Sequence, residues 1–137
     1  MPVFNLWIDQ GRAPQDETYQ YIVIPNASAK HLPWQATGSE FEVLSNTKSI
    51  QAVYSRSLKL AEIAFREPGS LPTPLGEVKA DHSCLLLVRQ IANGWKLAAS
   101  NPENQSLIIN VAVQGKQLAI QLPDGFLAGS SIVTTIR

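Results

Sequence analysis

The side chains that could carry chemistry are few and scattered in this chain. His31 and His82 each stand in a predicted loop, with no second ligand at a metal-binding spacing such as His-x-x-x-His. We therefore interpret both as surface histidines. Cys84 is the one cysteine, so it cannot form an internal disulfide. It lies in an apolar run with no activating His or basic residue in the same strand, which predicts a buried structural thiol.

Acidic residues crowd one predicted turn, at Asp9, Asp16 and Glu17. They could bind a cation, but no Asp-x-Asp-x-Asp-Gly loop is present, and capping of the turn explains them more simply. Pairs of carboxylates for glycoside hydrolysis can lie anywhere in a β-sandwich, so the acids neither support nor exclude that activity. The chain has no Gly-x-Ser-x-Gly motif, phosphate loop or dinucleotide fingerprint. The sequence therefore predicts no catalytic residue, no metal ligand and no cofactor.

Tryptophan is the residue type that could stack on a sugar ring. Trp7 and Trp95 have apolar neighbours in predicted strands, which favours a place in the core. Trp34, beside Pro33 in a predicted loop, is the candidate for exposure and for sugar contact. One exposed ring does not make a binding site.

Composition bounds the class of protein. The 137 residues, of which 45% are hydrophobic, fit one domain with one core. Eleven basic and eleven acidic residues balance, so no net field attracts nucleic acid or an anionic membrane surface. The apolar runs are too short to span a bilayer, and the N-terminus does not look like a signal peptide. We expect neither nucleic acid nor membrane as a partner.

The hydrophobic pattern favours β-structure throughout. Asn93-Gly94 predicts the tight turn of the clearest hairpin, and Gly115-Lys116 the turn of another. Residues 57–65 could form an amphipathic helix, but their neighbours on both sides are β, so we favour a strand. The predicted strands cover residues 3–9, 18–24, 41–44, 49–54, 57–65, 83–91, 95–100, 107–113, 117–122 and 130–136.

Other segments read as connections. Because both sets of alternating residues in 18–24 are largely apolar, that strand is expected to be covered on both faces. A short helix is expected over 29–32, and residues 67–76, with three prolines and two glycines, are expected to form an ordered loop. About ten short strands without βαβ alternation predict an all-β fold, an antiparallel β-sandwich.

The stretch from Trp7 to Pro25 resembles the C-terminal β region of family eight polysaccharide lyases, the group of hyaluronate, chondroitin AC and xanthan lyases. The family has Asp-His-Gly-x-x-Pro, then Tyr-x-Tyr and Pro-Asn. Gln10 departs from it, where the family usually has His. A weaker likeness continues in order through 42–47, 50–53 and 98–102. The matching residues, which we interpret as structural, are Asp9, Gly11, Pro14, Tyr19, Tyr21, Pro25 and Asn26.

The resemblance implies a non-catalytic C-terminal domain. Such lyases cleave uronic-acid-containing polysaccharides by β-elimination, with catalytic residues from an N-terminal α/α toroid, and none of those residues maps onto this chain. Residues 1–137 would form one sandwich domain, in which 1–26 resemble the end of the central sandwich and 27–137 the C-terminal domain. The implied partner is the rest of the lyase, with at most peripheral contact to polymer, and the implied location is secreted or periplasmic.

Two alternatives remain open on the residues alone: a free-standing carbohydrate-binding sandwich, and a structural interaction module. A sugar platform needs two or three rings on one face, and only Trp34 looks available. If residues 3–25 complete the sheet of a larger protein, this chain should expose an unsatisfied edge or an apolar patch. We expect it to self-associate through that surface.

Overall fold

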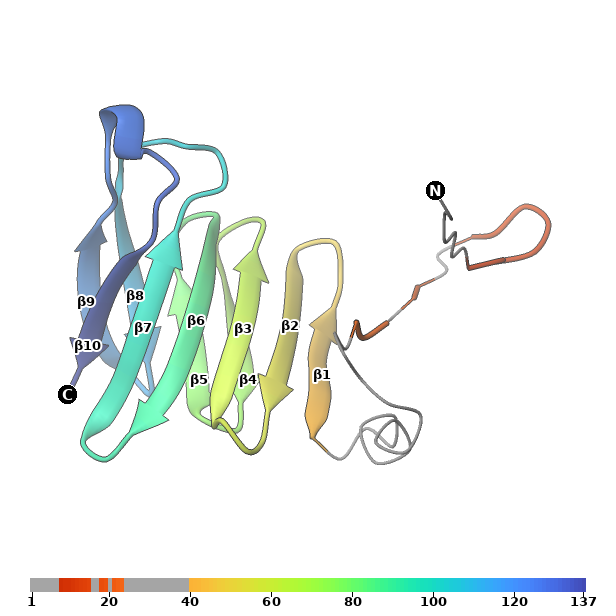
Figure 1. Ribbon diagram of the computed structural model, residues 1–137, viewed down its shortest axis with the longest axis horizontal. Helices are drawn as coiled ribbons and strands as arrows, with labels where there is room; N and C mark the ends of the chain where they lie inside the picture. The colour runs from red at the N-terminus through yellow and green to blue at the C-terminus, as the bar shows by residue number, and fades with distance from the viewer. Residues whose placement is uncertain (1–7, 16–17, 20, 24–39) are drawn as a thin grey trace, which may run out of the picture.

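The computed structural model describes residues 8–15, 18, 19, 21–23 and 40–137. Among these, residues 41–136 form ten strands in two antiparallel sheets, with one short 3-10 turn (Figure 1). The six-stranded sheet has the order β1-β2-β3-β6-β7-β10, and the four-stranded sheet the order β4-β5-β8-β9. In chain order, the elements of the described residues are β1 (Phe41–Asn46), β2 (Ile50–Ser55), β3 (Leu60–Phe65), β4 (Gly69–Thr73), β5 (Gly76–Ala80), β6 (Cys84–Ile91), β7 (Gly94–Ser100), β8 (Ile108–Val113), β9 (Lys116–Gln121), η1 (Gly125–Leu127) and β10 (Ile132–Ile136). The predicted all-β sandwich is confirmed.

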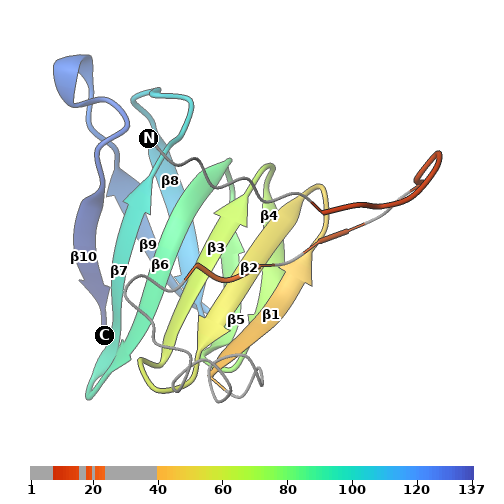
Figure 2. The ribbon, with the colours of Figure 1, turned by 45° about the vertical axis from the view of Figure 1, so that its right-hand side comes forward.

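The chain builds the two layers alternately. It leaves the six-stranded sheet after β3, forms the β4–β5 hairpin in the other layer, and returns as β6 beside β3. It leaves again after β7, forms the β8–β9 hairpin, and returns as β10 beside β7. Figure 2 shows the six-stranded sheet in front of the four-stranded one. Every pair of hydrogen-bonded neighbours within the sandwich is antiparallel.

The core lies between the sheets and follows from the alternation of side chains along each strand. In β6, for example, Cys84, Leu86 and Val88 are buried while Leu85 and Leu87 are exposed. Segment 57–65 behaves in the same way: its residues 60–65 form β3, with Ala61, Ile63 and Phe65 pointing inward, so the strand prediction is confirmed there. The largest fully buried side chains are Phe65, Ile63, Leu86, Leu97 and Ile109.

The predicted loop over residues 67–76 is wrong, because most of it forms β4 and the start of β5. Pro72, which indicated a loop, lies in β4, an edge strand of its sheet. An edge strand has one side without ladder hydrogen bonds, so the missing N–H of proline is tolerated there. Gly76, with φ of +101°, follows a two-residue turn, where Thr73 Oγ1 accepts a hydrogen bond from the Leu75 N–H at 3.0 Å.

The predicted strands at the start of the chain are wrong in the residues that the structure describes. Ile8 and Asp9 of the first, and residues 18, 19 and 21–23 of the second, belong to no strand. Residues 18–24 were also expected to be covered on both faces, but Tyr19, Tyr21 and Val23 are 59%, 64% and 75% exposed. Apolar β-formers alone do not make a strand without a partner to pair with. The expected helix over 29–32 lies outside the described residues.

The hairpin predicted at Asn93-Gly94 is confirmed, since β6 and β7 pair there, but its turn consists of Ala92 and Asn93, and Gly94 is the first residue of β7. Gly94 has φ of +119°, a conformation that side-chain-bearing residues rarely adopt. A Cβ at this position would lie 2.0 Å from the backbone oxygen of Ile136. Glycine therefore permits both the turn and the close approach of the end of β10. Within the described residues, no helix has the length and apolar character needed to cross a membrane.

Asp81 fastens the start of the β5–β6 connection to β8. Its carboxylate accepts hydrogen bonds from the backbone N–H and the side-chain amide of Asn110, at 2.7 and 2.6 Å, and lies 2.8 Å from His82 Nδ1. Partial burial opposes ionisation, but the hydrogen bonds from His82 and Asn110 prevail and lower the pKa of Asp81 to about 2. The ionised carboxylate therefore fixes the start of the β5–β6 connection to the four-stranded sheet.

We expect Asp81→Asn to remove part of the acid sensitivity of the fold. Because folding lowers the pKa of this carboxyl, its stabilisation is complete above pH about 4 and is lost as the pH falls towards about 2. At neutral pH the variant should lose about 1 kcal/mol of unfolding free energy, and the difference from the parent should shrink across that window. Urea unfolding at several pH values measures this. Asp124→Asn, at a position without a side-chain capping hydrogen bond, is the control. A stability difference between Asp81→Asn and the parent that stays constant with pH would contradict the lowered pKa of Asp81.

Candidate functional site

The family motif begins in a turn that its acid stabilises. The Gly11 N–H donates a hydrogen bond to Asp9 Oδ1 at 2.8 Å, and Gly11 has φ of +77°. The capping interpretation is therefore confirmed for Asp9, while Asp16 and Glu17 lie outside the described residues. Pro14 is exposed in the same segment. In the part of the chain that the structure describes, no three His, Cys, Asp or Glu side chains gather as metal ligands would.

The Tyr-x-Tyr part of the motif forms an exposed aromatic pair. The rings of Tyr19 and Tyr21 stack with their centroids 6.2 Å apart and their planes inclined by 14°. Residues two apart in an extended chain lie on the same side, which explains the stack. Sequence reasoning counted only Trp34 as an available ring and missed this pair. Trp34, Pro25 and Asn26 lie outside the described residues, so their assigned roles stay predictions.

The remaining candidates for chemistry behave as structural residues. His82 is exposed and contacts Asp81, as expected of a surface histidine, and His31 lies outside the described residues. Cys84 is fully buried, and burial raises the pKa of its thiol to about 12, so the thiol stays protonated. Trp95 is buried, as predicted, whereas Trp7 lies outside the described part.

The outer face of the six-stranded sheet, which faces the viewer in Figure 1, carries an apolar row. The strand register places six residues directly beside one another, one from each strand. Apart from Glu62, all of them are apolar, and Leu87 and Val133 are 40% and 59% exposed. We call this set the outer row; it consists of Val43, Val53, Glu62, Leu87, Ala98 and Val133.

Further apolar side chains of the same face lie next to the outer row. Phe41 and Leu85 are exposed two residues along the strands from Val43 and Leu87, and residues two apart share a face. The outer face of the other sheet is different in character, since it presents Glu77, Lys79, Asn110, Gln117 and Gln121 to solvent. The two outer faces therefore differ: in the described residues, the six-stranded sheet has the more apolar outer face, interrupted in the outer row by Glu62, and exposed apolar patches often mark an interface.

Polar contacts fix the point where the chain enters this sheet. Glu40, just before β1, accepts hydrogen bonds from the hydroxyl groups of Ser55 and Ser57 at 2.6 and 2.7 Å. These hydrogen bonds lower the pKa of Glu40. They also explain why Ser55, on the outer face, is only 6% exposed. Glu40 is thus held at the edge strand β1, beside the outer row.

Comparison with known proteins identifies the fold family. Residues 42–107 match the sequence model of the polysaccharide lyase family 8 C-terminal β-sandwich domain. The chain is 28% identical over 136 residues to chondroitinase-AC of Pedobacter heparinus, covering 95% of this chain and 19% of that protein. It is 23% identical over 131 residues to xanthan lyase of Bacillus sp. (strain GL1), with coverages of 96% and 13%. It therefore spans about a fifth or less of these curated relatives.

Solved structures agree with this assignment at the level of fold. A chondroitinase AC lyase structure, from a study of enzyme–oligosaccharide complexes, superposes with a TM-score of 0.64 at 24% identity, covering 74% of this chain and 16% of that one. Paenibacillus xanthan lyase gives a TM-score of 0.56 at 22% identity, with coverages of 66% and 9%. Residues 42–107 are thus identified with the polysaccharide lyase family 8 C-terminal β-sandwich domain, and the chain is related to chondroitinase AC, xanthan and hyaluronate lyases.

Proposed function

We propose that this chain is the non-catalytic C-terminal domain of a larger lyase that degrades uronic-acid-containing polysaccharides by β-elimination. The family match and the much greater length of the relatives support the lyase part of the proposal. In the proposed lyase, residues 1–26 continue a preceding sandwich and residues 27–137 form the terminal domain. Since such polymers lie outside the cell, the proposed location is secreted or periplasmic.

The outer row is the observation that carries the structural role. Five of its six residues are apolar, and burying them against another layer would stabilise the assembly by about 25 cal/mol for each Å² of apolar surface removed from solvent. β1 is the first strand of the sandwich, and it contributes Val43 and Phe41 to this face. We therefore assign the outer row as the surface that packs against the remainder of the enzyme and supports it.

A sugar-binding role is the second candidate, and the Tyr19–Tyr21 pair is the observation that favours it. Two exposed aromatic rings are available, which the sequence alone did not indicate. However, stacked rings cover each other's inner faces, so the pair offers one free face on each side and no broad platform. For this reason we rank the docking role first.

The docking role predicts a selective effect of charge on the outer row. Leu87→Glu in the full-length lyase should lower the stability of the assembled enzyme by about 2 kcal/mol, because the new carboxylate would be buried without a partner. In the 137-residue chain alone the same change should leave the fold intact, with a loss of less than about 1 kcal/mol from the new carboxylate opposite Glu62, since Leu87 is exposed there. Thermal unfolding of both forms measures the effect, with elimination activity followed by the ultraviolet absorbance of the unsaturated uronate product.

Ile108→Glu is the matched control, because Ile108 is an exposed apolar residue of β8 in the four-stranded sheet. Equal effects of the two substitutions on the full-length enzyme would rule out the outer row as the interface. The 137-residue chain is also expected to self-associate through its uncovered apolar side chains, with Leu87→Glu weakening the association. A strictly monomeric chain in light scattering at high concentration would count against this part of the proposal.

A further inference from the structure

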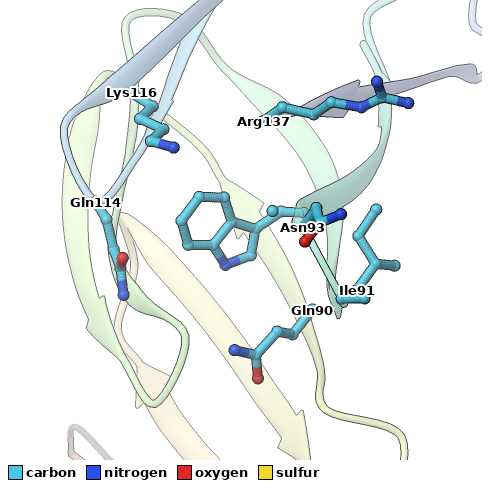
Figure 3. Close-up of a pocket in the computed structure, with 9 residues that line it drawn as sticks. Gln90, Ile91, Asn93, Gln114, Lys116 and Arg137 are labelled. Carbon is cyan, nitrogen blue, oxygen red and sulfur yellow. The ribbon is translucent and has the colours of Figure 1, made fainter.

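A shallow depression lies at the end of the sandwich where the β6–β7 and β8–β9 turns meet the end of β10. Its volume is about 450 Å³, within the range of roughly 300–1,000 Å³ that is usual for small-molecule sites. Figure 3 shows Gln114 and Lys116 on one side of it, Ile91 and Asn93 on the other, and Gln90 below them. Residues far apart in the sequence thus converge here.

The charged side chains that line this depression are all cationic. Lys116 and Arg137 are cationic, and none of the residues that line it is acidic. The amide groups of Gln90, Asn93 and Gln114 add hydrogen-bond donors and acceptors that suit hydroxyl groups. Cationic and amide groups together, without a carboxylate, favour a ligand that carries both an anionic group and hydroxyls.

A buried donor at the same place has no partner. The indole Nε1 of Trp95 is shielded from solvent and makes no hydrogen bond within the described part of the chain. Such a group is destabilising, because it loses its hydrogen bonds to water and gains none in the fold. The large majority of buried polar atoms in proteins are therefore hydrogen-bonded. Lys116 Nζ lies 5.9 Å from the centroid of the Trp95 ring. An anion bound to Lys116 would therefore lie near the indole ring, and the ligand would have to displace the atoms that shield Nε1 in order to bind it.

We propose that this depression binds a carboxylate-bearing sugar unit, with Lys116 as the ionic partner, the Trp95 N–H as a hydrogen-bond donor, and the Gln90 and Gln114 amides as partners of the sugar hydroxyls. The cationic and amide chemistry points to the anion and the hydroxyls, whereas the choice of a uronate rests on the proposed function. The proposed role of the depression is binding only.

The test is a titration of the ¹⁵N-labelled 137-residue chain, followed by the indole N–H resonance that disappears in Trp95→Phe. An oligosaccharide of alternating glucuronate and N-acetylhexosamine should shift this resonance in a saturable way. The same oligosaccharide with its carboxylates reduced to alcohols is the matched ligand, and it should bind at least tenfold more weakly. A chain extended beyond Arg137 by Gly-Ser, which moves the terminal carboxylate away, should bind at least as well as the original.

Variants localise the binding. Lys116→Ala should weaken it about tenfold, whereas Lys48→Ala, in the exposed β1–β2 turn, should not change it. Equal binding of the carboxyl-reduced ligand, or no saturable shift of the Trp95 resonance, would overturn the proposal. Inorganic sulfate that binds as tightly as the oligosaccharide would overturn the sugar assignment and leave an anion site. None of these readouts depends on elimination activity or on domain docking, so failure here is distinct from failure of the proposed function.

Discussion

Phe65→Ala is expected to lower the free energy of unfolding by about 3–5 kcal/mol, the usual loss when a large aromatic side chain is deleted from a core. Phe65 is the largest of the fully buried side chains and is 1% exposed. It pairs with Ile50 on β2 and with Cys84 on β6, and its ring lies against Gly69 at the start of β4. The substitution would leave a cavity where both layers meet, which the surrounding strands cannot fill completely.

Urea unfolding of the 137-residue chain measures this loss. Phe126→Ala is the matched control, because Phe126 is 97% exposed in η1, and it should change stability by less than about 0.5 kcal/mol. A small effect of Phe65→Ala would show that the two sheets do not share one tightly packed core at this point. An effect of similar size in the control would indicate that the 3-10 turn is buried against something in solution.

The second large effect is expected for Gly94→Ala, with a loss of about 3 kcal/mol. Two penalties combine: alanine is strained at φ of +119°, and its Cβ would lie 2.0 Å from the Ile136 oxygen. Backbone cannot rotate away as a side chain can, so β10 must shift from β7. The same substitution at Gly115, where φ is +79° and no atom lies within 4 Å of the added Cβ, should incur only the conformational strain, about 1–2 kcal/mol.

The difference between the two glycine variants isolates the close approach of β10. Urea unfolding gives both values, and amide hydrogen exchange in β10 shows where the damage lies. Protection in β10 should fall in Gly94→Ala and stay unchanged in Gly115→Ala. Equal losses in the two variants would mean that β10 does not press on the turn.

Much of the sandwich could be predicted because local rules determined it. The alternation of apolar side chains in β6 predicts a strand, and Asn93-Gly94 predicts a hairpin. Neither prediction requires knowledge of the rest of the chain. The segment 69–73 could not be found in this way, since Pro72 is compatible with a strand only at a sheet edge. The segment 18–24 failed for the opposite reason: Tyr19, Tyr21 and their neighbours favour a strand, but the described residues have no strand beside them.

The candidate surfaces were harder to predict than the fold. The outer row depends on the register of six strands, and Val43 and Val133 come from its two edges, about ninety residues apart in sequence. The depression likewise depends on the fold, because Trp95, Lys116 and Gln90 lie together only where the β6–β7 and β8–β9 turns are neighbours. The apolar sequence neighbours of Trp95 correctly predicted its burial. Its indole nitrogen has no hydrogen-bond partner among the described residues, which depends on the neighbours that the fold places around it.

The order of strands in the six-stranded sheet has a mechanical consequence. β1 and β10 form its opposite edges, and because six antiparallel strands separate the entry at Phe41 from the exit at Ile136, both lie at the same end of the sheet. Tension between these two points therefore acts across the strands and loads the ladder hydrogen bonds one after another. The sandwich would peel from its edges under low force, whereas strands pulled along their length would share the load and resist together.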